Sequence, residues 1–199
     1  MSVVDTELRN VLFVSRNKDN RWLNDSLCKP FKPRTKSFMA KISPFDVSSL
    51  YEEFQAFVNE GTNGEISRLY VSVNARDETK VHKALIHELI DKDDFDVTKI
   101  DSKIASIAMK PVNRKTSHWL FDYDQDDFDN FYNFMLWTSQ ETNILGWKRT
   151  MHGYALIVSH GFDTREILKA YPMTTLKRDA MFLSLWGAKK GILEIDKEH

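Results

Sequence analysis

Apolar residues recur along the chain with two different periods, which predicts strands interleaved with helices. Alternation with a period of two is typical of strands, and spacings of three and four residues are typical of helices. The alternation is clearest in residues 68–74. We predict further strands at residues 10–15, 37–42, 119–123 and 180–186, and a pair of strands within 145–159, joined around His152 and Gly153.

The helical periods mark five segments. One begins near Leu50, where Ser49 and Glu52 have the spacing of a capping box, and ends before Gly61. A second follows Asp77, which is expected to cap it. The other three lie near residues 96–109, at 126–137 and from Asp163 onward. Residues 16–36 are polar and basic around two prolines, so we predict a loop there. The charged tail from Lys189 is expected to fray.

The helix at 126–137 carries an aromatic stripe. Phe128, Phe131, Tyr132 and Met135 fall at i, i+3, i+4 and i+7, which places them on one face. Such a stripe is typical of a helix packed on a core rather than of a surface for stacking nucleic-acid bases. We therefore expect all four side chains to be buried.

The order of elements predicts an α+β protein with a mostly antiparallel sheet and flanking helices. Its 199 residues correspond to a single domain, since domains average roughly 150 residues. Because the chain returns through adjacent strands, we expect one sheet-centred core of ferredoxin-like or RNA-recognition-like type.

Composition restricts the partners and the kinds of site. The formal net charge of −1 provides no global attraction for nucleic acid or acidic membranes, so such contacts need a local basic patch. Cys28 is the only cysteine, which excludes an internal disulfide and a cysteine-rich zinc site. No apolar run approaches the ~20 residues of a membrane span, and the first residues lack the pattern of a signal peptide. We expect a cytoplasmic protein with no membrane partner.

The segment 119–123 carries the most specific chemical signal. Residues two apart on a strand share a face, so Asp122 and Asp124 should project together, opposite Trp119, Phe121 and Tyr123. Two neighbouring carboxylates repel each other unless a cation lies between them. Mg²⁺ or Mn²⁺, which prefer oxygen ligands, would meet that need. The alternative is that both aspartates merely begin an acidic, exposed turn.

Three blocks together resemble the archaeo-eukaryotic primase and primase–polymerase superfamily, particularly its small phage-type relatives. The blocks are Trp-Leu-Phe-Asp-Tyr-Asp at 119–124, Arg-Thr-Met-His-Gly-Tyr-Ala-Leu-Ile-Val at 149–158, and Leu-Lys-Arg-Asp-Ala-Met-Phe-Leu at 176–183. The resemblance implies that Asp122, Asp124 and a third acidic residue, Asp179, bind metal and are catalytic.

The second and third blocks depart from the pattern of that family. The family places a histidine that meets the nucleotide phosphates where this chain has Ala155, and a histidine occurs earlier, at His152. Either His152 replaces it from the turn, or the phosphate ligand is lost. In the third block Asp179 follows Arg178 rather than an apolar residue.

The resemblance implies nucleotidyl transfer, which needs carboxylate-held cations and positive charge on the triphosphate. We expect the nucleotide to be bound by His152 and by five basic residues: Lys148, Arg149, Arg165, Lys177 and Arg178. The leading hypothesis is a primase-polymerase-like protein that binds nucleotides or nucleic acid with metal, its transferase activity retained, reduced or lost. The alternatives are a non-catalytic relative that binds a protein or nucleic-acid partner, and a metal-dependent phosphodiesterase.

Overall fold

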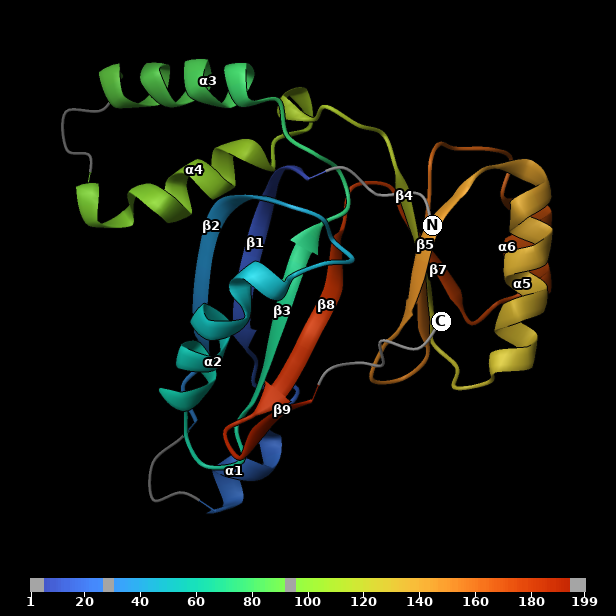
Figure 1. Ribbon diagram of the computed structural model, residues 1–199, viewed down its shortest axis with the longest axis horizontal. Helices are drawn as coiled ribbons and strands as arrows, with labels where there is room; N and C mark the ends of the chain where they lie inside the picture. The colour runs from blue at the N-terminus through green and yellow to red at the C-terminus, as the bar shows by residue number, and fades with distance from the viewer. Residues whose placement is uncertain (1–5, 27–30, 92–95, 194–199) are drawn as a thin grey trace.

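The computed structural model describes residues 6–26, 31–91 and 96–193, and these form an α+β protein with two antiparallel sheets. The α+β class and the antiparallel pairing are therefore confirmed. The expectation of one sheet is wrong, because the strands divide into two groups that share no strand pairing (Figure 1). Cys28 and the tail after Leu193 lie outside the described residues. None of the described helices is long and apolar enough to cross a membrane.

The first sheet has the strand order β2-β1-β3-β8-β9. Its strands are β1 (Glu7–Ser15), β2 (Arg34–Ile42), β3 (Ile66–Ser72), β8 (Met181–Ala188) and β9 (Gly191–Leu193). All neighbours are antiparallel. β8, which comes late in the sequence, pairs with β3, so the first sheet contains strands from both halves of the chain.

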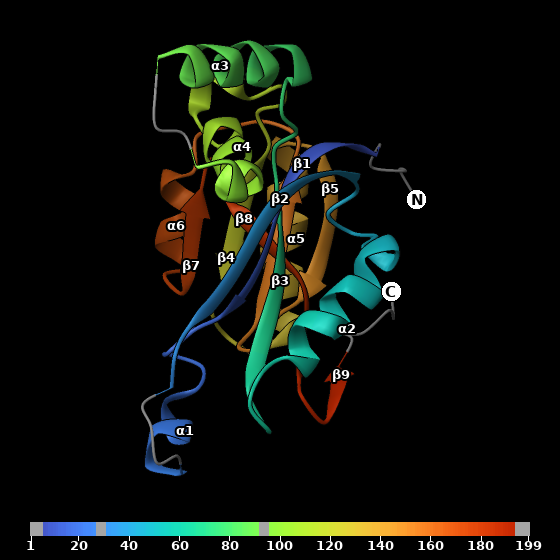
Figure 2. The same cartoon turned by 90° about the vertical axis from the view of Figure 1, so that its left-hand side faces the viewer.

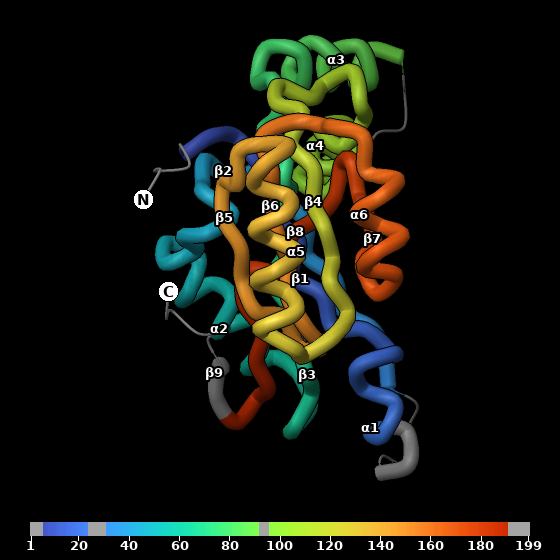
Figure 3. Tube along the Cα trace, turned by 90° about the vertical axis from the view of Figure 1, so that its right-hand side faces the viewer, coloured from blue at the N-terminus to red at the C-terminus, as the bar shows by residue number. Residues whose placement is uncertain are grey.

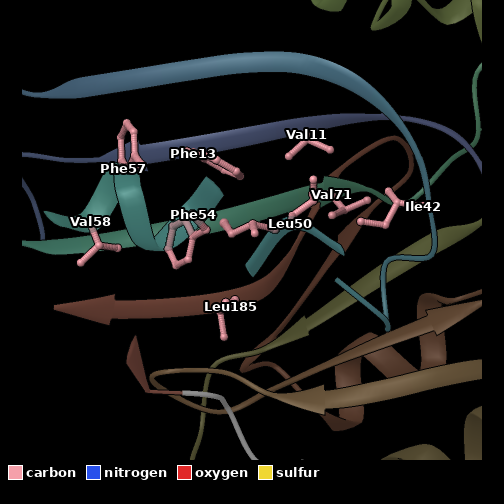
Figure 4. Packing of buried hydrophobic residues seen from close by; sticks show 10 residues of the cluster. Val11, Phe13, Ile42, Leu50, Phe54, Phe57, Val58, Val71 and Leu185 are labelled. Carbon is pink, nitrogen blue, oxygen red and sulfur yellow. The ribbon is translucent and has the colours of Figure 1, made fainter. Parts of the chain in front are cut away.

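Helix α2 (Tyr51–Asn59) covers one face of this sheet (Figure 4). The buried residues of this core come from four strands and from α2 with the turn before it: Val11, Phe13, Ile42, Leu50, Phe54, Phe57, Val58, Leu69, Val71 and Leu185. The helix predicted to begin near Leu50 is thus confirmed, but its capping box is not. Ser49 lies in a short 3₁₀ helix, Ser48–Leu50, and the N-cap of α2 is Leu50, without a side-chain hydrogen bond.

Helices α3 (Glu78–Ile90) and α4 (Ile100–Ala108) pack together at one end of the first sheet, opposite the end that carries α1 (Arg21–Ser26) (Figure 2). The predicted cap of α3 is confirmed, since the Asp77 side chain accepts a hydrogen bond from Lys80 N. Residues 16–36 are not simply a loop, because they contain α1 and the start of β2. Two further 3₁₀ helices, Val97–Lys99 and Pro111–Asn113, flank α4.

The second sheet has the order β5-β6-β4-β7, formed by Ile144–Arg149, Tyr154–Val158, Trp119–Tyr123 and Thr174–Lys177. Helix α5 (Phe128–Glu141) connects β4 to β5, and α6 (Arg165–Ala170) connects β6 to β7. Both helices lie on the outer face of this sheet (Figure 3). The predicted hairpin within 145–159 is confirmed as β5 and β6.

The alternation of β4 sorts its side chains between the two faces as expected. Phe121 and Tyr123 are fully buried against Phe131 and Phe134 of α5. The predicted stripe on α5 is only partly core, because Phe128 and Tyr132 are exposed and Met135 is half-buried. The helix turns a different face to the sheet from the one that the apolar spacing suggested, since its buried residues are Phe131, Phe134 and Thr138.

The inner face of the second sheet packs against the first sheet through a mixed apolar cluster. Its buried residues are Val73, Leu120, Ala155, Ile157, Ala180 and Phe182. Phe45, from the loop after β2, stacks edge-on against Phe182 at a centroid distance of 5.3 Å. Leu120 thus lies on the helix-free side of β4. Asp122, two residues later, is on the same face.

Candidate metal and nucleotide site

Asp122 and Asp124 lie at the end of β4, on the helix-free side of the second sheet. Asp122 is part of the strand, and the Asp124 amide extends the ladder by donating to Met173 O at 3.1 Å. Strand geometry therefore places the two residues on one face, with Cα atoms about 6.6 Å apart at ~3.3 Å per residue. Asp124 is exposed, and the Asp122 side chain is 26% exposed. Both carboxylates are therefore accessible to solvent.

A lysine already accompanies this pair. The ammonium group of Lys177, on β7, is hydrogen-bonded to a carboxylate oxygen of Asp122. The lysine side chain is 44% exposed, so such an ion pair contributes about 0–1 kcal/mol and is easily exchanged. Lys177 was predicted to bind nucleotide and Asp122 to bind metal, and the structure places these two side chains in contact.

Ala155 lies directly opposite Asp122 in the ladder between β4 and β6. Its side chain is buried in the apolar cluster between the sheets, with Leu120 and Phe182. Under the primase resemblance, position 155 would carry the histidine that binds phosphate. This position does adjoin Asp122, but its side chain is a methyl group. A methyl group offers no hydrogen bond to a phosphate.

The turn between β5 and β6 brings His152 to the same end of the second sheet as Asp124. Gly153 in this turn packs directly on the backbone that follows β4. A Cβ there would lie 2.0 Å from Tyr123 O and 2.7 Å from Gln125 N. Only glycine fits so close an approach. His152 is exposed beside this contact, which is compatible with the prediction that it meets a ligand from the turn.

Asp179 does not join Asp122 and Asp124. It accepts hydrogen bonds from Arg76 at 2.8 and 3.1 Å and from Asn74 at 3.2 Å. Asn74 also donates to His118 O at 3.1 Å, so Asp179 lies beside His118, four residues before Asp122. Along a strand four residues span about 13 Å, which is too far for one metal ion to be shared. We therefore correct its predicted role to that of a carboxylate partner for Arg76.

The predicted basic residues are divided among several places. Lys148 donates to Ser184 O at 2.6 Å and so ties the second sheet to β8. Arg149 forms two hydrogen bonds with Asp126, at 2.7 and 3.0 Å, near the start of α5. Arg178 lies over the ring of Trp119 at 5.1 Å. Of these three, Arg149 is at the end of the sheet where Asp124 and His152 lie.

Arg165 is at the opposite end, at the start of α6. It pairs with Asp163 through its Nε and Nη2 atoms, and these hydrogen bonds lower the pKa of Asp163 to about 2. Phe162, three residues earlier, stacks on Trp119, which is the first residue of β4. Arg165 is therefore separated from Asp124 by the length of β4, and the structure does not bring it to the carboxylate pair.

The carboxylates of Asp122 and Asp124 are too few to hold a metal ion alone, but they fit a metal that is bound together with phosphates. Within the described ranges, no group of three or more His, Cys, Asp and Glu side chains is close enough to hold a metal ion. Mg²⁺ commonly keeps several waters and takes one or two carboxylates together with substrate phosphates. Asp122 and Asp124 meet that smaller requirement.

Sequence reasoning missed a buried polar network at the junction of the sheets. Arg76 has a fully buried side chain, and Arg9 donates to the carbonyl oxygens of Ile42, Ser72 and Val73. Burial lowers the pKa of Arg9 to about 10. Burial and the charge of Arg9 also lower the pKa of His118. Neither arginine stands in a recognisable motif, and only the fold reveals that both are enclosed.

Comparison with protein-family models, with curated proteins and with solved structures finds no match for this chain. A pocket of about 450 Å³ lies away from the carboxylate pair, lined by Leu8, Arg76, Asp77 and the paired groups Glu7–Lys115 and Lys41–Glu78. Its opposite charges neutralise one another, so it offers no clear ligand chemistry. The carboxylate pair on β4 remains the candidate site.

Proposed function

We propose that this chain is a primase-polymerase-like protein that binds a nucleotide or the end of a nucleic acid together with Mg²⁺ or Mn²⁺. The observation that supports the proposal is the position of Asp122 in β4, with Lys177 against its carboxylate and the exposed Asp124 two residues further on, where the Asp124 amide continues the ladder to Met173 O. Carboxylates, a lysine and the nearby His152 are the groups that a metal–phosphate ligand requires.

We further infer that the second sheet is a ferredoxin-like core of the type found in RNA-recognition domains. The connectivity β4-α5-β5-β6-α6-β7 supports this, since it is the βαββαβ pattern of that core. The order β5-β6-β4-β7, with every neighbour antiparallel, agrees with it. In this arrangement β4 is a central strand, and Asp122 is on the face without helices.

A bound metal would supply positive charge that stabilises the phosphate oxygens. Asp122 and Asp124 would hold it, and Lys177 would then be released from Asp122. Its ammonium group, on a flexible and half-exposed side chain, is suited to follow the phosphates as a mobile point charge. His152 would contact the same ligand from the turn.

We favour a protein that binds nucleotide and metal but whose nucleotidyl transfer activity is reduced or lost. Transfer requires the triphosphate to be positioned as well as bound. Ala155 offers no polar group opposite Asp122, and Asp179 is engaged by Arg76. The same two features favour the second candidate, a non-catalytic relative that serves as a binding protein.

Calorimetric titration tests the proposal. We expect manganese alone to bind in the micromolar-to-millimolar range, and more tightly when a non-hydrolysable ATP analogue is present, because the phosphates complete its coordination. Asp122→Asn and Asp124→Asn should each weaken binding of the manganese–nucleotide complex by at least about tenfold, or ~1.4 kcal/mol. Asp129→Asn, an exposed aspartate on the first turn of α5, is the matched control and should leave binding unchanged.

Equal binding by the parent and both variants would exclude the carboxylate pair as the site. A primer-extension assay separates the two forms of the proposal. Robust templated synthesis by the parent that is lost in Asp124→Asn would show an active polymerase and contradict our preference for binding without transfer.

A further inference from the structure

Residues 16–36 form a strongly basic segment that the proposed function does not use. The segment contains seven lysine or arginine residues and two aspartates, a formal charge of +5, whereas the whole chain has a net charge of −1. Helix α1 and the start of β2, which the segment contains, lie at the end of the first sheet opposite α3 and α4 (Figures 1 and 2). The positive charge is therefore concentrated at one end of the molecule.

The segment is anchored to the first sheet at several points. Asn20, just before α1, accepts a hydrogen bond from Ile66 N at 2.7 Å and donates one to Ile66 O at 3.0 Å, which binds it to the start of β3. Leu23 of α1 is 1% exposed, and Phe31 is also buried. The basic side chains thus project from a backbone that packs on the sheet.

The loop between α2 and β3 connects α1 with the turn between β8 and β9. Trp22 of α1 packs on Gly64 of this loop, since a Cβ added to Gly64 would lie 2.5 Å from the tryptophan ring. Lys189, in the turn, donates a hydrogen bond to Gly61 O at 2.7 Å. These regions therefore form one surface. We call it the α1 end and define it by residues 16–26, 31–34, 60–65 and 188–190.

Two carboxylates of the α1 end are enclosed and paired with arginines. The Asp19 side chain is 6% exposed and accepts hydrogen bonds from Arg16 and Arg68. The Glu65 side chain is 3% exposed and accepts two hydrogen bonds from Arg34, at 2.6 and 2.9 Å. These two carboxylates are therefore largely withdrawn from the surface and neutralised within it.

The exposed charge of the α1 end is mostly positive. Glu60 is an exposed carboxylate there, at 3.7 Å from Arg34. Within the described part of the chain, four exposed basic residues of the α1 end have no ion-pair partner: Lys18, Arg21, Lys32 and Lys190. Four unpaired cations around one exposed, already paired carboxylate produce the local basic patch that contact with a polyanion requires.

An exposed aromatic ring in this positive surface indicates which polyanion it suits. Trp22 is 47% exposed and follows Arg21 in the chain. Proteins that bind single-stranded nucleic acid combine basic side chains, which contact the phosphates, with aromatic rings on which the unpaired bases stack. Arginine is suited to the first contact because its guanidinium can donate two hydrogen bonds to one phosphate. We propose that the α1 end binds a single-stranded nucleic acid.

An acidic membrane would also be attracted by the positive charge, but the residues favour it less. Binding in a membrane surface relies on an amphipathic helix with a broad apolar face. Helix α1 has six residues, and of its two large apolar side chains Leu23 is buried and Trp22 is exposed. One exposed ring can stack on a base, but it does not form an apolar face.

This surface is separate from the candidate metal and nucleotide site. The α1 end belongs to the first sheet, whereas Asp122 and Asp124 belong to the end of β4 in the second. Contacts to phosphates and bases at the α1 end need no metal, so EDTA in the assay removes the metal that the carboxylate pair requires. The inference therefore stands without the proposed function, and each can fail alone.

Fluorescence anisotropy of the full chain with a labelled oligothymidylate of about 20 nucleotides, in EDTA and low salt, tests the proposal. Replacing Lys18 and Arg21 together, Lys18→Gln with Arg21→Gln, should weaken binding by about tenfold or more. The slope of log affinity against log salt should become shallower by about 1.4, since each lost phosphate contact removes about 0.7. Trp22→Ala should weaken binding by about fivefold or more through the loss of one stacked base, while every charge is kept.

Lys80→Gln with Lys83→Gln is the matched control, because it removes the same charge from exposed positions on α3, at the other end of the first sheet. It should leave the affinity and the salt slope unchanged, and circular dichroism checks that each variant is folded. No binding of the oligonucleotide, or an equal loss in the two double variants, would overturn the proposal. So would tighter binding of a duplex of the same length, or binding to phosphatidylserine vesicles alone, since the occupant would then be a duplex or a membrane.

Discussion

Replacing Asp179 with alanine is expected to lower the free energy of unfolding by about 3 kcal/mol. The substitution would leave the guanidinium of Arg76, whose side chain is fully buried, without the carboxylate that accepts two of its hydrogen bonds. Removing one partner of a buried ion pair typically costs 3–5 kcal/mol, and we take the lower end because the Asp179 side chain is 18% exposed. In a chain of this size the loss corresponds to a decrease in Tm of roughly 6–12 °C.

Thermal unfolding with and without manganese distinguishes the two roles of Asp179. A partner of Arg76 should show the same loss under both conditions, whereas a metal ligand should show a larger one when manganese is present. Asp163→Ala removes an exposed partner of Arg165 and should melt like the parent. If Asp179→Ala melted like the parent, the structural role assigned here would be wrong.

Phe121→Ala is expected to cost about 3–5 kcal/mol, the usual range for removing a phenylalanine from a core. Phe121 is fully buried on β4 and contacts Phe134 of α5 at a centroid distance of 5.4 Å. Its loss would leave a cavity between the central strand and the helix that covers it. Denaturant unfolding of the variant measures the cost directly.

The matched substitution is Phe128→Ala, which removes the same side chain from an exposed position on α5. It should cost clearly less than Phe121→Ala, because 42% of the Phe128 side chain is already exposed and less apolar surface is lost from the core. Equal costs for the two substitutions would contradict the assignment of the faces of β4 and α5.

The sequence predicted local structure better than it predicted the grouping of strands. The alternation in 119–123 correctly separated Phe121 and Tyr123 from Asp122, because a period of two is fixed by strand geometry. The presence of two sheets was not predictable, since periodicity does not say which strands pair. The pairing of β8 with β3 joins segments more than a hundred residues apart.

Because periodicity does not show which strands pair, it also could not predict which distant residues would lie near the candidate site. Asp122 and Asp124 are two residues apart in the chain, so the spacing alone predicts that they share a face. Asp179 follows β7, and its position depends on how β7 pairs with β4. In that pairing Lys177 lies opposite Leu120, so Asp179 comes beyond the start of β4, at the end away from Asp124.

The exposure of Phe128 and Tyr132 was missed because this helix has overlapping apolar faces, and spacing alone does not say which of them packs on the sheet. The buried face is the one that contains Phe131 and Phe134.

A crystal structure of the protein with manganese and a non-hydrolysable nucleoside triphosphate tests the central claim most directly. The anomalous signal of manganese should lie between the carboxylates of Asp122 and Asp124 and the nucleotide phosphates. Lys177 should have left Asp122 for a phosphate oxygen, while Asp179 stays bound to Arg76. A structure with manganese bound elsewhere, or with nucleotide bound while the Lys177–Asp122 pair remains intact, would contradict the account.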